Sequence, residues 1–346
     1  MSYIPVPTIQ LTPQMCEMAV LGGAILGGGS GGKLETGLSW AQMALDLGGA
    51  ALIPLDRVVH EDAFIVIGAH IRSARHTRYP PLRLFHRAID LIRHNTEGEF
   101  GGIVNCGSGA LLTQVGWLES ALTGVPLVDV VLGQGYHPSP VRGILSLCAE
   151  AGCALSIAYA GMVQDGSYLE AYLSGPAALL VREFDQEEGL FPDAFALAVG
   201  PVHLDWLKRH GIPGLVQRAM HVGERVIQAT PAGGRAVAEA VSQVLGGMVA
   251  GFGTITAIQS VDEGRGGYVI HLWDDQNVPL IITYHHAYVE LVRAGETLAR
   301  FPDLIVTLGT GGIPLSIEEL TEGQDVYIVV VPAASIYRSQ VTHPPA

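Results

Sequence analysis

Residues 101–131 read GGIVNCGSGALLTQVGWLESALTGVPLVDVV, and this stretch decides the fold class. Its two ends, Gly101–Asn105 and Pro126–Val131, are short runs rich in Val, Ile and Leu. The segment between them, Ala110–Leu122, has the length and composition of a helix. Two apolar strands joined through a helix run parallel and are buried on both faces. We therefore predict an α/β fold with a mostly parallel sheet and flanking helices.

The same alternation of apolar strands and helices continues on both sides of this unit. Thr12-Pro13 is typical of a helix start, because Thr caps the first turn and Pro fits its first position. Residues 171–193 fit either an insertion or an edge hairpin. The other predicted strands are Ala50–Leu55, Ala63–Ala69 and Ala154–Ala160, and the other predicted helices are Met15–Leu26, Leu34–Leu47, Leu82–His94, Val141–Ala151, His203–His210, Leu215–Ala229 and Arg235–Leu245.

From Met248 the pattern changes to strands separated by Gly, Asp and Pro turns, which indicates a smaller β-rich domain. Its predicted strands are Gly251–Ser260, Gly267–Asp274, Pro279–Tyr284, Leu304–Leu308 and Asp325–Val331. We divide the chain into an α/β domain over 1–165, a mixed or helical segment over 166–247 that completes or bridges it, and the β-rich domain over 248–335.

The charge of the chain restricts its partners. The 346 residues carry a formal net charge of −14, which disfavours nucleic acid and anionic membranes. The first twelve residues, MSYIPVPTIQLT, lack the basic and apolar regions of a signal peptide, and apolar runs such as Val326–Ala334 are too short to span a bilayer. We expect a cytoplasmic protein with a small-molecule substrate, either a homo-oligomer or bound to a protein partner.

Polar residues follow three of the predicted strands. His70, Asn105 and Asp129 stand at strand ends, and His137 lies in the polar loop after Asp129. In open parallel sheets ligands bind outside the carboxyl ends of the strands, so these side chains are candidates for substrate binding or water activation. The alternative is structural: Asp129 caps a turn, Asn105 makes a local turn and His70 is solvated.

The glycine-rich stretch Gly27–Gly32 is the most unusual local feature. The consecutive residues Gly28, Gly29, Ser30, Gly31 and Gly32 could direct backbone N–H groups at an anion or a carbonyl oxygen. The stretch follows a predicted helix and lacks the Lys-Ser/Thr ending of a P-loop. The alternative is a tight turn between two helices without a ligand.

Further candidates for substrate contact are Lys208, near an Ile-Pro-Gly turn, and the pair His285-His286, at the end of a predicted strand. Adjacent strand residues face opposite sides, so at most one of these histidines faces a given site. No compact metal motif is present, and the cofactor stays unknown. A divalent metal held by His70, Asp129 and a histidine of the β-rich domain is an alternative way to acidify water.

Several segments, in this order, resemble the S-methyl thiohydantoin desulfurase family. Residues 19–32 are similar to a stretch that reads LGTGGGG in the family, and Gly124–Asp129 is similar to its GLPVVDADGMGRAFPE turn. Lys208–Gly214 fits its K-x-x-x-IPG motif, and the most specific match is Phe301–Val306 followed by PLSIEELTEGQDV at Pro314–Val326.

This resemblance implies an α/β domain followed by a β-rich domain, and an activity on hydantoins or thiohydantoins. The named reaction hydrolyses an S-methyl thiohydantoin to a hydantoin and methanethiol. Some members occur beside or fused to enzymes of the hydantoinase or oxoprolinase type. Three polar family positions differ here: they read Gly68-Ala69-His70, Val104–Gly109 and His285-His286.

Our leading hypothesis is therefore a hydrolase of a small thiohydantoin-like cyclic amide, in which water attacks the ring carbon between the nitrogens. Asp129 or His137 would be the general base, and the Gly28–Gly32 amides with Asn105 would hold the developing negative charge. The changed polar positions motivate an alternative, a non-catalytic binding or accessory subunit of a hydantoinase-type assembly. A nucleotide-binding enzyme that uses the glycine-rich stretch is a third hypothesis.

Overall fold

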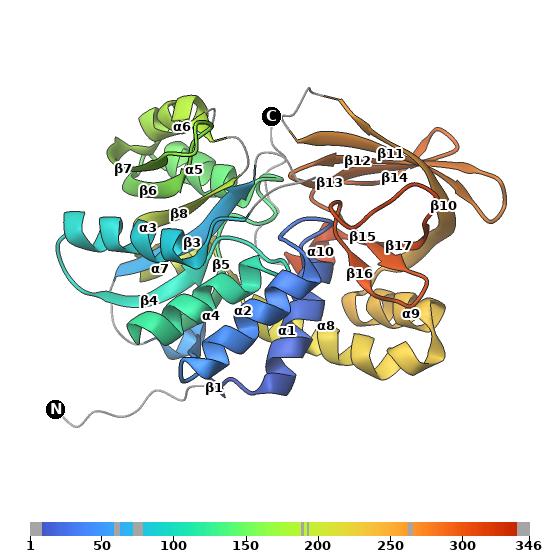
Figure 1. The fold of residues 1–346 in the computed structure, drawn as a ribbon, viewed down its shortest axis with the longest axis horizontal. Helices are drawn as coiled ribbons and strands as arrows, with labels where there is room; N and C mark the ends of the chain where they lie inside the picture. Colours follow the sequence, from blue (N-terminus) through green and yellow to red (C-terminus); the bar gives the residue numbers. More distant parts are fainter. Residues whose placement is uncertain are drawn as a thin grey trace.

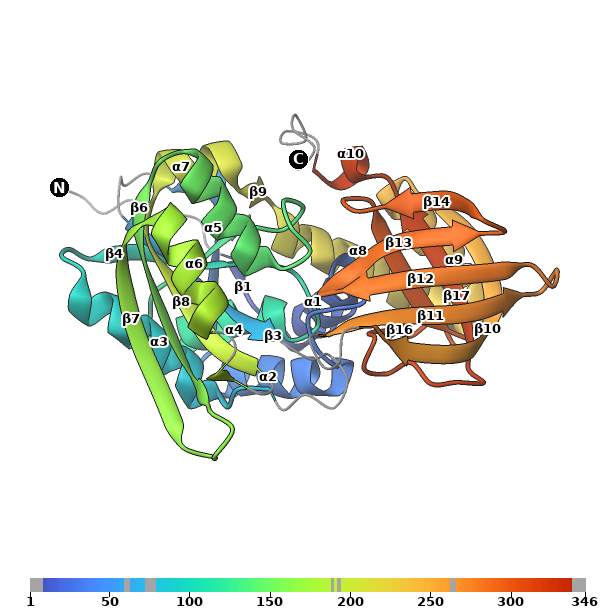
Figure 2. The same ribbon diagram turned by 90° about the horizontal axis from the view of Figure 1, so that it is seen from above.

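A computed structural model describes residues 9–58, 63–71, 79–187, 190–191, 194–261 and 266–337. Two β-sheets lie at opposite ends of the molecule, and helices α1 (Pro13–Leu26) and α8 (Leu215–Ala229) lie between them (Figures 1 and 2). The combination of an α/β part and a separate antiparallel β part agrees with the sequence prediction. No described helix is long and apolar enough to span a membrane.

The first sheet has a parallel centre and antiparallel sides, so the expectation of a mostly parallel sheet holds only for its centre. The parallel centre comprises β2, β5, β4 and β3, whereas β1, β8, β6, β7 and β9 pair antiparallel. In spatial order the strands are β1 (Ile9–Gln10), β2 (Ala51–Pro54), β5 (Leu127–Val131), β4 (Phe100–Asn105), β3 (Ala63–Ile71), β8 (Ala194–His203), β6 (Ala154–Met162) and β7 (Tyr168–Pro176), with β9 (Ile212–Pro213) beside β5.

Helices cover both faces of this sheet. In β3, Ile65 and Ile67 join the core on the side of α1–α4, whereas Phe64 and Val66 join the core on the side of α5 and α6. This alternation of fully buried residues is expected of a strand inside an α/β sheet. The helices are α2 (Leu34–Asp46), α3 (Leu82–Asn95), α4 (Leu112–Thr123), α5 (Pro140–Glu150), α6 (Ala177–Glu187) and α7 (Leu204–His210), with short 3-10 turns at Leu55–Arg57 and Thr230–Ala232.

Helices α1 and α8 pack with their backbones in contact, and two glycines make this approach possible. A Cβ at Gly22 would lie 1.7 Å from the carbonyl oxygen of Ala219, and a Cβ at Gly223 would lie 1.8 Å from the carbonyl oxygen of Met18. Any larger residue at either position would therefore push the two helices apart. This helix pair leads from the first sheet to the second.

The second sheet is antiparallel throughout and follows α9 (Gly234–Leu245). The structure adds β13 and β14, which the sequence analysis did not predict; they form a hairpin whose turn contains Ala294 and Gly295 at positive φ. In spatial order the strands are β14 (Glu296–Arg300), β13 (Ala287–Arg293), β12 (Pro279–His285), β11 (Gly267–Asp274), β10 (Met248–Ser260), β17 (Asp325–Val331), β15 (Leu304–Gly309) and β16 (Pro314–Leu315), and α10 (Ala333–Ile336) follows.

Candidate functional site

The glycine-rich loop Gly27–Gly32 lies between the two sheets, after the end of α1 and before the start of α2. Its carbonyl oxygens hold both parts of the chain. The backbone N–H groups of Tyr288 and Ile317, from the β-rich part, donate to Gly28 and Gly29 at 2.9 Å each, while Leu111 donates to Gly31 at 2.8 Å. The loop is thus both a turn between two helices and a connector between the two sheets.

Small residues are required here by close contacts as well as by conformation. Gly29 has φ +81°, and a Cβ there would lie 2.2 Å from the ring of Tyr288. Gly31 has φ +84°, and a Cβ there would lie 2.4 Å from the Cα of Gly109. The N–H groups of Gly29, Gly31 and Gly32 donate no hydrogen bond within the described part of the chain, so they remain available to an acceptor.

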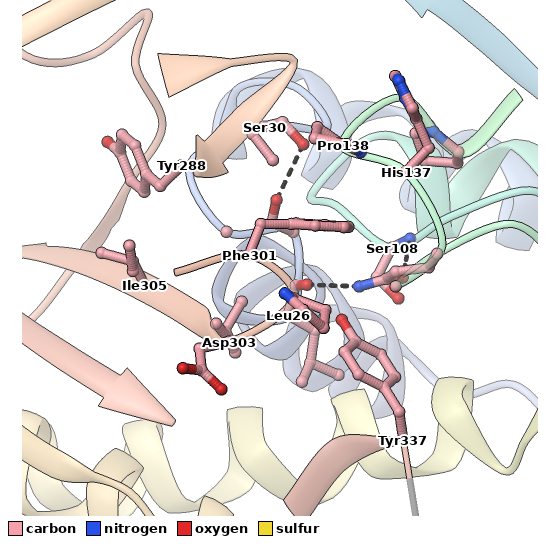
Figure 3. Close-up of a pocket in the computed structure, with 18 residues that line it drawn as sticks. Leu26, Ser30, Ser108, His137, Pro138, Tyr288, Phe301, Asp303, Ile305 and Tyr337 are labelled. Atoms are coloured by element: carbon pink, nitrogen blue, oxygen red, sulfur yellow. Dashed lines mark hydrogen bonds between the residues drawn. The ribbon is translucent and has the colours of Figure 1, made fainter. Parts of the chain in front are cut away.

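One side of the loop borders a narrow pocket at the carboxyl ends of β4 and β5 (Figure 3). The loops after these strands contribute Ser108 and His137, the glycine-rich loop contributes Ser30, and the β-rich part contributes Tyr288 and Phe301. The pocket volume is about 30 Å³. This is enough for ordered water.

His137, which the sequence analysis placed in the polar loop after Asp129 and proposed as a catalytic residue, lines this pocket. Its Nδ1 accepts the backbone N–H of Ser139 at 2.9 Å. In a neutral imidazole the proton then resides on Nε2, so the ring presents a donor rather than a base. The prediction of His137 as general base therefore conflicts with its hydrogen bonding in this structure.

Gln134, from the same loop, holds the pocket together. Its Nε2 donates to the carbonyl of Leu26 at 2.7 Å, and its Oε1 accepts the N–H of Ser108 at 2.9 Å. It also hydrogen-bonds Tyr337, whose burial raises its pKa to about 12. Ser30 turns its hydroxyl back to the carbonyl of Gly27, at 2.9 Å. These contacts rigidify the pocket walls.

Asp129 does not lie in the pocket, and the structure does not place it as a general base. Its side chain is fully buried, and its carboxylate accepts the N–H of Val216 at 2.8 Å and both the N–H and the Nε2 of Gln217, at 3.3 and 2.7 Å. Burial raises the pKa of Asp129, while these hydrogen bonds lower it. Asp129 therefore has a structural role, as the alternative supposed, but it caps the N-terminus of α8 rather than a turn.

Asn105 is likewise engaged in structure. Its Nδ2 donates to the carbonyl of Thr113 at 3.2 Å, and its Oδ1 accepts the N–H of Gly116 at 3.1 Å. Because both groups hold α4 and the residue is buried, the predicted charge-stabilising role does not fit it. His70 lies in β3, and its backbone pairs with Phe195 of β8. The side chain of His70 lies outside the described part of the structure.

The remaining predicted contacts lie away from the pocket wall. Lys208 is exposed in the last turn of α7, where a cation is favourable next to the helix dipole. His285 ends β12, and His286 occupies the turn before β13 with φ +60°. Their rings meet edge to face with centroids 4.7 Å apart, so they do not alternate as strand residues would. Ala287, which follows them, lines the pocket.

Glu318 is a site candidate that the sequence analysis missed. Its Oε1 accepts a hydrogen bond from the hydroxyl of Tyr79, whereas its Oε2 is shielded from solvent without a partner among the described residues. Burial raises the pKa of Glu318 to about 8, and the charge of Lys33 opposes that shift. The available signal was its position inside the segment Pro314–Val326, which carried the most specific family match.

Glu318 lies beside the glycine-rich loop. Its neighbour Ile317 donates to Gly29, and Lys33 directly follows Gly32. A carboxyl group with a pKa of about 8 and the ammonium group of Lys33, close enough to oppose that shift, thus lie beside the glycine-rich loop. Such a set can exchange a proton and hold an acceptor atom. Among the described residues, no three His, Cys, Asp or Glu side chains form a cluster fit for a metal ion.

Comparisons with known proteins support the resemblance. Residues 191–342 match the family model described as "S-Me-THD-like, C-terminal domain". A crystal structure of a protein from Chromobacterium violaceum has the same fold, with a TM-score of 0.66, 17% identity, and coverage of 94% of this chain and 92% of that chain. No curated protein matches the sequence significantly. The resemblance to the S-Me-THD family inferred from sequence is thereby confirmed for the C-terminal domain.

Proposed function

We propose that this chain, whose residues 191–342 are an S-Me-THD-like C-terminal domain, hydrolyses a small cyclic amide of the thiohydantoin or hydantoin class. The observation that carries the proposal is the carboxyl group of Glu318 beside the glycine-rich loop, with one oxygen held by Tyr79 and the other buried without a partner among the described residues. Proton transfer is the chemistry that such a perturbed carboxyl group serves.

In the proposed reaction, water adds to the ring carbon that bears the methylthio group. Ionised Glu318 takes one proton from the attacking water as the carbon–oxygen bond forms. The carbon–sulfur bond then breaks and methanethiolate leaves. One proton ends on the ring nitrogen and the other on the thiolate, so the products are a hydantoin and methanethiol.

The glycine-rich loop would stabilise the negative charge that develops on the ring. The N–H groups of Gly31 and Gly32 have no acceptor within the described part of the chain, and Lys33 adds a positive charge next to them. Preorganised donors of this kind typically contribute about 3–4 kcal/mol to transition-state stabilisation. Asp129 and Asn105 have no part in this scheme, because their polar atoms are already engaged.

The test is turnover of S-methyl thiohydantoins, followed by thiol release, in the natural protein and in Glu318→Gln. The variant keeps the shape of the side chain but cannot accept a proton, and we expect its kcat to fall at least 100-fold. Glu35→Gln, which removes an exposed carboxylate on α2 close to the loop in sequence, is the control. Equal rates in Glu318→Gln and the control would exclude Glu318 from the reaction.

A second candidate is the non-catalytic binding or accessory subunit of a hydantoinase-type assembly. It is favoured by the fact that Asp129, Asn105 and Nδ1 of His137, all predicted to do chemistry, have structural partners instead. It predicts stable co-purification with such an enzyme and no thiol release by the chain alone. We also propose a cytoplasmic location and a homo-oligomeric state.

A further inference from the structure

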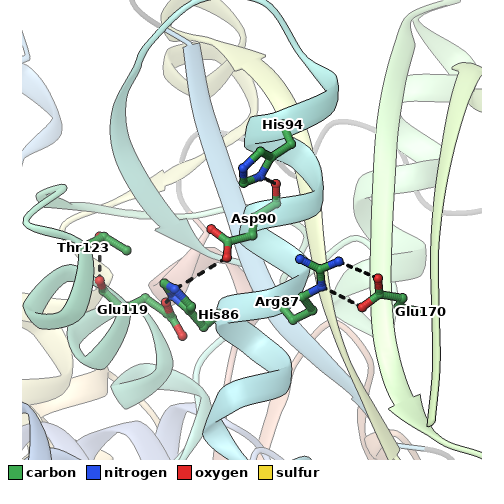
Figure 4. Close-up of polar contacts among 7 residues, drawn as sticks. All are labelled: His86, Arg87, Asp90, His94, Glu119, Thr123 and Glu170. Atoms are coloured by element: carbon green, nitrogen blue, oxygen red, sulfur yellow. Dashed lines mark hydrogen bonds and ion pairs between the residues drawn. The ribbon is translucent and has the colours of Figure 1, made fainter.

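A second group of titratable side chains lies away from the glycine-rich loop, between α3 and α4 (Figure 4). Glu119 of α4 has a fully buried side chain, and its Oε2 is 3.1 Å from Nδ1 of His86 on α3. Its Oε1 is buried without a partner in the described residues. Nε2 of His86 is 3.6 Å from Oδ2 of Asp90, one turn further along α3. A partly exposed imidazole thus lies between a buried carboxyl group and a partly exposed one.

We propose that the protonation of Glu119, in its cluster with His86 and Asp90, sets how firmly α3 packs against α4. With its proton bound, the buried carboxyl group of Glu119 is neutral. When that proton is lost, a buried carboxylate with one oxygen unpartnered among the described residues lies between the helices. An unpaired buried charge is costly, so the contact between the helices weakens.

Charged and titratable groups next to this cluster have contacts of their own. Arg87, next to His86, is engaged by Glu170 of β7 at 2.6 Å, and His94 Nδ1 lies 2.7 Å from the backbone carbonyl of Asp90. Helices α1 and α2 also pack against α4 but make no hydrogen bond or ion pair with Glu119 in the described residues. Burial raises the pKa of Glu119 to about 7; His86 lowers it and Asp90 raises it.

The cluster is connected to the candidate site through both helices. Tyr79, which donates to Glu318, lies three residues before the start of α3. Leu112, the first residue of α4, and Leu111, directly before it, donate to the carbonyl of Gly31 in the glycine-rich loop. A change in the packing of α3 on α4 therefore alters how Tyr79 lies relative to the loop. This regulatory consequence rests on the proposed function, whereas the titration itself does not.

The direction of the effect follows from linkage. The folded protein binds a proton on Glu119 more tightly than the unfolded chain, so the contribution of this group to stability falls as pH rises from about 4.5 to about 7. Between pH 5 and pH 8 the unfolding equilibrium constant should rise about 70-fold through this group alone. Glu119→Gln stays neutral at every pH and should lose this component.

The experiment is urea unfolding of the natural chain, Glu119→Gln, His86→Gln and Glu170→Gln at pH 5, 6, 7 and 8. Relative to Glu119→Gln, the unfolding equilibrium constant of the natural chain should rise about 70-fold between pH 5 and pH 8, and that of His86→Gln should rise further over the same range, because His86 lowers the pKa of Glu119. Glu170 is the matched control: its pKa is lowered to about 2 by Arg87, so its variant should follow the natural chain.

The proposal would be overturned if the ratio between the unfolding equilibrium constants of the natural chain and Glu119→Gln changed by less than about threefold from pH 5 to pH 8. Because unfolding needs no substrate, this result is independent of whether the chain is a hydrolase. If turnover is found, the pH profile of turnover in Glu119→Gln tests whether the titration of Glu119 also affects the candidate site. An unchanged profile would remove the link to the site, and a shifted profile would support it.

Discussion

Asp129 offers the sharpest test of how this fold is held together. Asp129→Ala removes a buried carboxylate that accepts three hydrogen bonds from the start of α8. Asp129→Asn keeps the volume and one acceptor oxygen but replaces the other oxygen by an NH₂ group, which faces a donor. If Asp129 were a general base, both variants would lose activity without losing stability. If Asp129 is a helix cap, both variants lose stability.

The expected magnitudes follow from these contacts. Hydrogen bonds to a charged acceptor contribute about 1.5–3 kcal/mol each, and an N-terminal cap contributes about 1 kcal/mol. The terms overlap, and burial penalises the ionised form of Asp129, as its raised pKa shows. We therefore expect Asp129→Ala to lower the free energy of unfolding by about 3–5 kcal/mol and Asp129→Asn by about 1–2 kcal/mol.

The assay is urea unfolding followed by far-UV circular dichroism at pH 7, with thiol release measured in the same samples and expressed per folded molecule. Asp46→Asn is the control, since exposed Asp46 bonds, among the described residues, only Gln42 of its own helix, and its effect should stay within about 0.5 kcal/mol. If Asp129→Asn kept its full stability and lost turnover, Asp129 would be a catalytic group and the capping role would be refuted.

Three further outcomes follow from the structure. Gly223→Ala should lower stability by about 2–4 kcal/mol, because its Cβ would lie 1.8 Å from a backbone oxygen of α1; a change below 1 kcal/mol in urea unfolding would contradict that packing. If Glu318 is the base, log(kcat) should rise with pH and level off above about pH 8, since the group must be ionised; a flat profile would argue against it. The hydroxyl of Thr12 caps α1 by accepting the N–H of Met15 at 3.3 Å. Thr12→Ala removes this cap and should lower the free energy of unfolding by about 0.5–1 kcal/mol in the same assay.

Local patterns predicted many of the elements. The parallel strands β3, β4 and β5 were visible as short apolar runs between helices, because a strand buried on both faces needs apolar residues at every position. The start of α1 was visible in Thr12-Pro13. These features depend on neighbours within a few residues, so the sequence alone contains them.

Other elements depended on distant partners. Strand β8 was missed, although it is apolar and buried, because the chain reaches it only after β6, β7 and α6 and then pairs antiparallel with β3 and β6. Its direction, and hence the mixed character of the sheet, is set by those pairings. The hairpin of β13 and β14 was missed although its turn residues, Ala294 and Gly295, were a usable local signal.

By itself, the sequence determined the class of the fold, the position of the glycine-rich loop and the family of the C-terminal domain. Only the tertiary structure decided which polar groups already have structural partners, as Asp129 does, and which polar atoms have none among the described residues, as Oε2 of Glu318. Asp129 meets the start of α8, 87 residues further along the chain, and Glu318 meets Tyr79 across 239 residues. The availability of a polar atom depends on what packs against it, and those neighbours are brought together only when the whole chain folds.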